Sequence, residues 1–506
     1  MFDSLCYHYN KAGLIFIKYF SCAYRSMWKV RRYILLFTTA CLFIFKGFSQ
    51  TSEPGSGNPN DQSSADTSEY RPFVIKDIII TGNKKTRPYI IERELPFRRG
   101  DSVSLSELVK KFERARELLV NTALFHEVVV SLKKFQGYQI YVSVEVKERW
   151  YIFPVPYFKP VDRNLAEWAK QGYGINRVNY GFKLSYYNFT GRNDRLKIWL
   201  ITGYTKQLQF QYDLPYIDKA LKHGIRFNFS YGTNKEVNYA TINDQQQFFK
   251  DTLSNAVLSK QYSLGVEFTY RPYIKTRNTF RLTYVHQEID TAVLNRNPEY
   301  FNNGATELSF PELSYRVEYF DVDYIPYPQK GFMGELQLLK RGLNNKMNMW
   351  QLSYKGSKNI PVARRTSYSL QSAGVLRLPF DQAYINQRLF GYSDFYLRGL
   401  EKYVVDGVAG LMVRNTFKRE VLHFSILSPF NTSVRHIPFQ FYLKTYADAG
   451  YSYNKQSIDN RLVNRLLYTA GLGIDMVTLY DLVLRFEYSF NQLGQPGFFF
   501  HVKNDF

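Results

Sequence analysis

The sequence has only three cysteines, Cys6, Cys22 and Cys41, and all of them lie within its first 50 residues. The rest of the chain therefore has neither a disulfide nor a cysteine metal site to hold it together. Its seven histidines are scattered without metal-site spacing. The chain also contains no G-x-S-x-G, no phosphate-binding loop and no G-x-G-x-x-G. These absences predict that the protein is not an enzyme and uses no metal, no other cofactor and no nucleotide.

Long apolar runs are also scarce, and the only candidate membrane helix lies near the N-terminus. MWKVRR, beginning at Met27, is followed by the 13-residue apolar run YILLFTTACLFIF and then by KGFSQ. A charged start, a short apolar centre and a small polar end are typical of a secretory signal peptide, and this run is too short to span a bilayer. We predict that residues 1–50 are a signal peptide with its true start at Met27, preceded by an upstream extension. The alternatives are a membrane-anchoring helix and a lipid attached at Cys41.

Residues 51–72 are rich in Ser, Gly, Pro and Asp and nearly without large apolar side chains. Such a segment buries too little surface to fold by itself. We predict a disordered linker here.

Residues 73–148 combine strand and helix patterns. FVIKDIIITGN is a predicted strand, Thr86–Leu95 is a predicted short helix with Pro88 near its start, and PFRRGD is a turn. A capping box of Ser104 and Glu107 begins a second helix, whose apolar positions share one face: Leu105, Leu108, Phe112, Ala115 and Leu119. HEVVVSLKK and YQIYVSVEVKE alternate as two strands. The segment is predicted to be a small α+β domain of order β-α-α-β-β.

Residues 149–506 alternate apolar and polar side chains, which is typical of strands. In GIRFNFSYG, for example, Ile225 and Phe227 share one face while Arg226 and Asn228 share the other. We predict sixteen strands, starting near 150, 176, 194, 206, 223, 259, 277, 308, 331, 346, 364, 407, 438, 467, 481 and 497. An even number allows the sheet to close into a barrel without unpaired edges in lipid. The predicted fold class is mainly β, a 16-stranded antiparallel transmembrane β-barrel preceded by one small α+β domain.

Loop lengths give a separate test of the barrel. The longest connections are 159–175, 233–258, 289–307, 379–406 and 453–466. All five join an odd strand to the next even strand, so all lie at one end of the barrel. Long outer loops and short periplasmic turns are the pattern of outer-membrane barrels. The alternative, a water-soluble all-β fold, does not predict this sorting.

The net charge of +22 raises the question of a nucleic-acid partner. The basic residues are spread through alternating strands, and no basic helix accompanies them. We interpret the charge as a basic barrel lumen and periplasmic surface, and we predict no nucleic-acid binding.

Several short motifs resemble known families. Gly82-Asn83 and the LVNTALF helix exit resemble the POTRA domain, the periplasmic module of outer-membrane assembly and transport proteins; a generic α+β domain is the alternative. Leu397-Arg398-Gly399-Leu400 resembles the V/I/L-R-G-F/Y motif in the sixth loop of the BamA/TamA-type superfamily (bacterial surface antigen family), although Leu400 replaces the aromatic residue. Further resemblances are YNFTGRND, DVDYIPYPQKGF, TYADAGY and the terminal Phe506.

Strand parity and the resemblance together point to one ion pair. Asp448 has the opposite parity to Phe439 and Leu443, so its carboxylate is expected to point into the lumen, where it requires a cation. The resemblance implies that this cation is Arg398, with the sixth loop folded into the lumen. Gly399 allows close backbone approach or a positive φ at the loop tip. The alternative is that Arg398 is a solvated loop charge.

The first predicted barrel strand contains Pro154 and Pro156, two residues apart. Their missing N–H groups face the same neighbour. If that neighbour is the last strand, which ends at Phe506, the seam between the first and last strands loses two hydrogen bonds. The resemblance implies lateral opening at this seam. The alternatives are that the prolines face the second strand or belong to the linker.

The resemblance implies that the protein assembles, inserts or translocates proteins at the outer membrane. Its expected partners are the outer-membrane lipid bilayer and client or partner proteins, which would bind the POTRA-like domain in the periplasm by strand addition. The alternatives are a passive or substrate-specific transport channel and a structural barrel within a larger complex.

Overall fold

The computed structural model describes residues 72–160, 178–251, 256–302, 304–344, 346–427, 436–455 and 460–503. The predicted signal peptide, nearly all of the predicted linker and the terminal Phe506 lie outside these residues. The chain divides at residue 70 into two units, and the described residues all belong to the second. Among them, no helix is both long and apolar enough to cross a membrane.

Residues 73–148 fold into the small α+β domain that the sequence predicted. Its elements are β1 (Phe73–Thr81), α2 (Pro88–Glu94), β2 (Ser102–Val103), α3 (Leu105–Asn121), β3 (Phe125–Gln136) and β4 (Gln139–Glu148). The sheet order is β2-β1-β4-β3, with β1 and β4 parallel. The two-residue strand β2 adds to the predicted order, since too few residues form it to show an alternating pattern.

The second helix of this domain begins as its sequence requires. Ser104 accepts a hydrogen bond from the backbone N–H of Glu107, and the Glu107 carboxylate accepts one from the N–H of Ser104. Leu108, Ala115 and Leu119 are buried in the domain core and Phe112 packs against it. Leu105, at the first helical position, remains 50% exposed, so the apolar face begins one turn later than expected.

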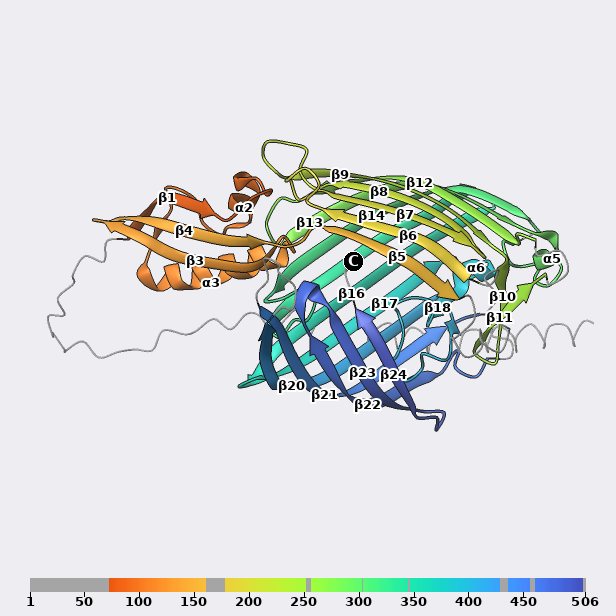
Figure 1. The fold of residues 1–506 in the computed structure, drawn as a ribbon. Coiled ribbons are helices and arrows are strands. Elements are labelled where there is room, and N and C mark those ends of the chain that lie inside the picture. The colour runs from red at the N-terminus through yellow and green to blue at the C-terminus, as the bar shows by residue number, and fades with distance from the viewer. Residues whose placement is uncertain are drawn as a thin grey trace, which may run out of the picture. The chain divides into compact units, whose positions relative to one another are not determined.

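Sixteen of the remaining strands form one antiparallel sheet, which curls into a barrel (Figure 1). Each begins within two residues of its predicted start. They are β5 (Ile152–Pro160), β6 (Val178–Tyr187), β7 (Arg195–Gly203), β8 (Lys206–Leu214), β9 (His223–Asn234), β12 (Ser259–Tyr270), β13 (Thr276–Ile289), β14 (Glu307–Val322), β15 (Gly331–Asn344), β16 (Met347–Ala363), β17 (Thr366–Leu378), β20 (Ala409–Leu427), β21 (His436–Tyr453), β22 (Leu466–Val477), β23 (Val483–Asn491) and β24 (Gly497–Lys503).

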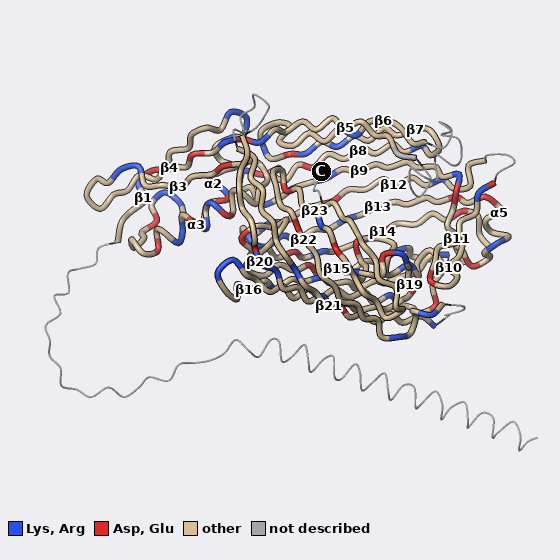
Figure 2. The backbone as a smooth tube through the Cα atoms, turned by 60° about the horizontal axis from the view of Figure 1, so that its bottom comes forward, with Lys and Arg blue, Asp and Glu red and all other residues tan. Residues whose placement is uncertain are grey.

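The connections at one end of the barrel carry structure of their own. They contain the hairpin β10 (Glu236–Ile242) and β11 (Gln245–Lys250), α5 (Thr291–Leu294), and α6 (Tyr384–Gln387) with the paired strands β18 (Arg388–Phe390) and β19 (Val405–Asp406). Figure 2 shows charged residues gathered around α5 and β11 and on the small domain, while the strands between are mostly uncharged.

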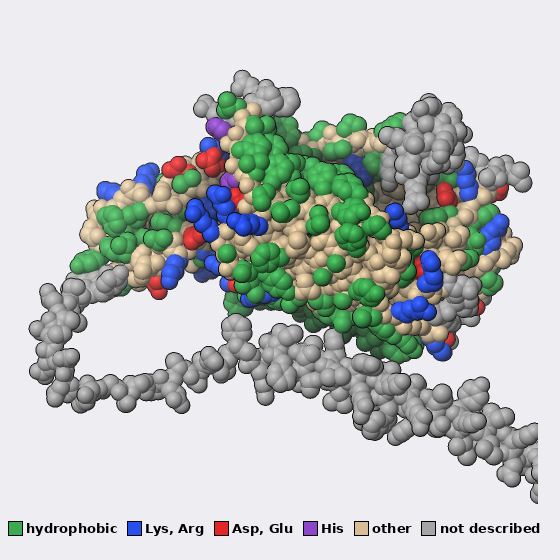
Figure 3. All heavy atoms as spheres, turned by 90° about the horizontal axis from the view of Figure 1, so that it is seen from below, with side chains coloured by type: hydrophobic (Ala, Val, Ile, Leu, Met, Phe, Trp, Pro, Cys, Tyr) green, Lys and Arg blue, Asp and Glu red, His purple; other side chains and the backbone are tan. Residues whose placement is uncertain are grey.

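The two faces of the sheet differ in character. On β21 the side chains of Tyr442, Lys444 and Asp448 are buried, while Leu443 is 49% exposed, as strand parity predicts. Large apolar side chains occupy the outward positions of most strands, among them Leu264, Leu282, Leu336, Phe486 and Phe500. Figure 3 shows this apolar wall on one side of the barrel, with clusters of Lys and Arg toward its ends. The polar groups are therefore enclosed and the apolar groups face outward.

Candidate functional site

Loop 6, which we define as residues 379–408 between β17 and β20, is fastened to the barrel at its base. Arg377, near the end of β17, donates hydrogen bonds to the carbonyl oxygens of Asn386, Arg388 and Gly407 at 2.8, 2.9 and 3.1 Å. The paired strands β18 and β19 close the loop above this point. The loop tip is thus delivered to one strip of the inner face, formed by β20 to β23.

The structure brings Arg398 at the tip of loop 6 together with Asp448 on β21. The Arg398 Nε and Nη2 atoms lie 2.8 and 2.5 Å from the two carboxylate oxygens of Asp448, a two-point contact. The guanidinium also lies 4.0 Å from the ring centroid of Tyr446. The Asp448 side chain is 0% exposed and that of Arg398 is 9% exposed. Charges this deeply buried require each other, because either one alone would bear its full desolvation cost.

Two more charged residues surround the pair. Arg414, opposite Asp448 in the β20–β21 ladder, places its Nε 3.9 Å from the Asp448 carboxylate and donates from Nη2 to the carbonyl of Tyr396. Glu487 on β23 lies 4.0 Å from Arg398. The loop tip is therefore held through its backbone as well as through its arginine.

Apolar contacts beside the ion pair fix the position of the tip. Leu397 is 1% exposed and lies against Gly450, where an added Cβ would meet the Leu397 methyl at 3.0 Å. Leu400, the position that departs from the family motif, is 4% exposed and joins a cluster that contains Tyr403, Leu462, Val463 and Leu467. Leucine therefore fills a packed site here. Tyr396 does not enter this cluster and instead lies against Arg414 and His501.

Gly399 occupies a position that no other residue fits without strain. Its φ is +90°, and an added Cβ would lie 2.8 Å from the Cβ of Ser489 on β23. Its carbonyl accepts a hydrogen bond from Asn491 at 2.8 Å. Positive φ and close approach, the two reasons the sequence offered for a glycine, are both present at this residue.

Replacing Gly399 by Ala should displace the loop tip. The side chain would add a steric contact to a backbone conformation that already costs about 1–3 kcal/mol for a residue with a Cβ. We expect faster protease cleavage of loop 6 and a lower Tm. Gly100→Ala is a matched control, because Gly100 has φ +89° but nothing within 4 Å of its added Cβ. Equal effects of the two substitutions would show that backbone strain alone, and not docking against β23, explains the result.

A second buried charge network, which the sequence did not reveal, lies on the same strip. Lys444 Nζ is 2.5 Å from Asp475 and 2.6 Å from Glu487. Tyr327, from the turn between β14 and β15, donates to the other oxygen of Asp475 at 2.8 Å. The sequence suggested this turn, DVDYIPYPQKGF, only as a motif. No local pattern marks Tyr327, because its partner is 148 residues away.

The backbone ladder directs Pro154 and Pro156 away from β6. Tyr187 donates its N–H to the carbonyl of Tyr151 at 2.8 Å, and the register pairs Pro154 with Leu184 and Pro156 with Phe182. Backbone groups in an antiparallel ladder alternate sides, so the two proline nitrogens point to the outer edge of β5. Within the described strands, β5 and β24 are the two ends of the hydrogen-bonded order. We call the line between them the seam.

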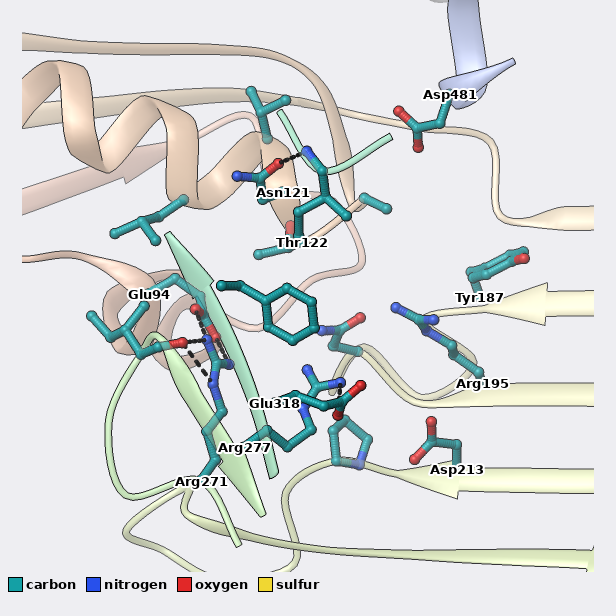
Figure 4. A pocket seen from close by; sticks show the side chains of 18 of the residues that line it. Glu94, Asn121, Thr122, Tyr187, Arg195, Asp213, Arg271, Arg277, Glu318 and Asp481 are labelled. Atoms are coloured by element: carbon teal, nitrogen blue, oxygen red, sulfur yellow. Dashed lines mark hydrogen bonds and ion pairs between the residues drawn. The ribbon is translucent and has the colours of Figure 1, made fainter. Parts of the chain in front are cut away.

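The small domain contacts the near end of the barrel around a polar cavity of about 540 Å³ (Figure 4). Glu94 on α2 accepts hydrogen bonds from Arg271 at 2.5 and 2.7 Å and from Tyr216 at 2.9 Å. On the far side of the cavity, Arg149 pairs with Asp481 at 2.6 Å, and Asn121 accepts from the N–H of Ile325 at 3.0 Å.

Glu94 has a shifted pKa. Burial would raise the pKa of this carboxyl, but the charge and hydrogen bonds of Arg271, with further help from Arg93 and Tyr216, hold it below its usual value. A carboxyl with a lowered pKa in the folded state stabilises that state above the unfolded pKa and stops doing so as pH falls through the folded pKa. The contact between the domain and the barrel should therefore weaken in acid.

The substitution Glu94→Gln tests this contact. We expect faster hydrogen exchange in α2, with a local opening free energy lower by about 3 kcal/mol, because Arg271 loses its buried partner. The acid-induced rise in exchange should also disappear in the variant. Glu92→Gln, on the same helix, breaks the more exposed pair with Arg99 at 3.0 Å and should change exchange little. Retention of the acid dependence in Glu94→Gln would assign it to another group.

Comparisons with known proteins agree with these elements. Residues 188–407 match the Omp85 superfamily domain, and residues 73–149 match the POTRA domain described as the surface antigen variable number repeat. No curated protein matches the chain.

Among solved structures, BamA from Haemophilus ducreyi lacking POTRA domains 1–3 is similar, with 15% identity, coverage of 85% of both chains and a TM-score of 0.47. CdiB from Escherichia coli shares 10% identity over 88% of this chain and 92% of its own, with a TM-score of 0.48.

Proposed function

Because the chain belongs to the Omp85 superfamily, with a POTRA domain followed by a sixteen-stranded antiparallel sheet, we propose that it inserts or translocates proteins at the outer membrane. In this proposal the barrel spans the bilayer with its apolar wall, and the POTRA domain lies in the periplasm. Loop 6 occupies the lumen. The protein inserts or translocates its client by conformational change and makes or breaks no covalent bond in it.

The seam carries this proposal. It lies between β5 and β24, the two ends of the hydrogen-bonded order, and β5 directs two prolines without N–H groups to that edge. An edge with few backbone hydrogen bonds opens at lower cost than any ladder within the sheet. Such an edge also offers unpaired carbonyl groups to an incoming strand.

Loop 6 supports the proposal from inside the barrel. Its tip contacts β21 through Asp448 and β23 through Ser489 and Glu487, close to the seam. Only one or two strands therefore separate the seam from the loop tip, so a movement of the strands at the seam would alter the contacts of the tip. We propose that the Arg398–Asp448 pair keeps the lumen closed and the C-terminal strands in register.

The POTRA sheet offers an edge for partners. β3 is the outer strand, and apolar side chains stand exposed along and beside it, among them Val129 at 45% and Phe135 at 50%. A strand added beside β3 would pair with its free backbone groups and cover these side chains. We propose that client or partner proteins bind at this edge.

Depletion of the protein followed by proteomics of the outer membrane tests the proposal. Broad loss of barrel proteins is the expected result for an assembly factor, and loss of one exported protein is expected for a dedicated secretion pore. An unchanged protein content would contradict both. Single-channel recording separates the other candidate function, since a large and steadily open pore would favour a transport channel.

A further inference from the structure

Three potential metal ligands from distant segments meet at the inner face beside the seam. Glu401 follows the motif of loop 6, Glu487 lies on β23 and His501 lies on β24. The Nε2 of His501 is 3.4 Å from Oε1 of Glu401 and 3.5 Å from Oε2 of Glu487. All three ligand atoms lie within 4.8 Å of one another.

Each of these atoms is buried and has no hydrogen-bond partner among the described residues. Glu487 is only 1% exposed, and polar atoms at such depth are nearly always satisfied. The opposite oxygens of the two carboxylates are engaged, since Glu401 Oε2 accepts from the N–H of Gly399 at 2.7 Å and Glu487 Oε1 lies 2.6 Å from Lys444. Each carboxylate thus has one oxygen in a fixed contact. Its other oxygen points toward His501.

The spacing of these atoms fits a specific kind of ion. Zinc binds histidine nitrogen and carboxylate oxygen at about 2.0–2.2 Å in tetrahedral geometry, which places neighbouring ligand atoms about 3.4 Å apart. The two separations at His501 agree with this value. One histidine and two carboxylates leave a fourth position for water, and nitrogen with oxygen ligands favours zinc over magnesium or calcium.

We propose that Glu401, Glu487 and His501 bind a divalent ion of the zinc type. The ion would join loop 6 to β23 and to the last strand of the barrel, so that the loop tip and the seam are fastened at one point. No sequence pattern indicates this site, because the ligands are separated by 86 and 14 positions in the chain. The inference concerns the barrel alone and does not depend on which clients it serves.

Zinc binding to the purified full-length protein tests the proposal. After treatment with a chelator, the protein is titrated with Zn²⁺ in detergent, and bound metal is measured by elemental analysis and competition with a chromophoric chelator. We expect one equivalent of zinc, a higher Tm with zinc than without it, and tetrahedral absorption bands when Co²⁺ replaces Zn²⁺. Glu401→Gln and His501→Gln should each weaken binding by more than about 100-fold.

Two choices of variant separate loss of the zinc site from general damage to the protein. Glu401 lies in loop 6 and not in a strand, so Glu401→Gln tests the site without altering the sheet. His286→Gln is the matched control, because His286 contacts Glu288 at 3.0 Å and no third ligand joins them among the described residues. This variant should still bind one equivalent of zinc. Absence of stoichiometric binding, or equal loss in the control, would overturn the proposal.

Discussion

Arg398→Ala should release loop 6 and remove most of the protein's function. The substitution leaves the buried Asp448 carboxylate without its two-point partner, a change that costs about 3–5 kcal/mol in a buried pair. Arg414, at 3.9 Å from Asp448, supplies part of the lost positive charge, so we expect the loss of stability to lie near the lower end of this range. The free energy of unfolding, protease cleavage of loop 6 and complementation of a depleted strain measure the effect.

Two further variants separate the charge from the loop. Arg398→Ala combined with Asp448→Asn removes the orphaned carboxylate, so stability should recover while loop 6 stays open to protease. Arg281→Ala breaks another pair to a buried carboxylate, Glu267, at 2.5 Å, but this pair lies within the wall between β12 and β13. The Arg281→Ala variant should leave loop 6 protected from protease. A fully protected loop in Arg398→Ala would contradict a closing role for the ion pair.

Replacing Pro154 and Pro156 together by Ala should strengthen the seam and reduce function. The change restores two N–H groups at the outer edge of β5, and each new backbone hydrogen bond contributes about 0.5–1.5 kcal/mol. Hydrogen exchange at the two new amides reports directly whether they find partners. We expect slow exchange there, a higher Tm and weaker complementation.

Pro311→Ala provides the matched control, because Pro311 lies in β14, far along the sheet from the seam. It should leave complementation unchanged. Fast exchange at residues 154 and 156 together with full complementation would contradict a gating role for the two prolines.

Most of the fold was predictable because its signals are local. Period-two alternation and turn residues placed the start of each of the sixteen barrel strands within two residues, and the capping box of Ser104 and Glu107 placed α3. The strands inside loop 6 were missed, since β18 and β19 together have only five residues and show no alternation. The hairpin of β10 and β11 within the predicted connection 233–258 was also missed, although its strands have seven and six residues.

The candidate site was predictable only in part. Strand parity gave the inward direction of Asp448, and the family resemblance supplied Arg398 as its partner. Strand parity does not indicate which turn between strands folds into the barrel interior. Tyr327, which lies in such a turn, was therefore missed. Parity also cannot bring together residues such as Glu401 and His501, whose proximity depends on the docked loop.

The position of loop 6 in the chain also sets an order of events during folding. The partners of Arg398 and Gly399 at its tip lie later in the sequence, with Asp448 50 residues and Asn491 92 residues away. Contacts between such distant residues form late, because the intervening chain must be ordered first. The tip of loop 6 thus cannot dock before β20 to β23 are in place. A barrel interrupted before its last strands would keep an open interior, and completion of the C-terminal strands would be the step that fills it.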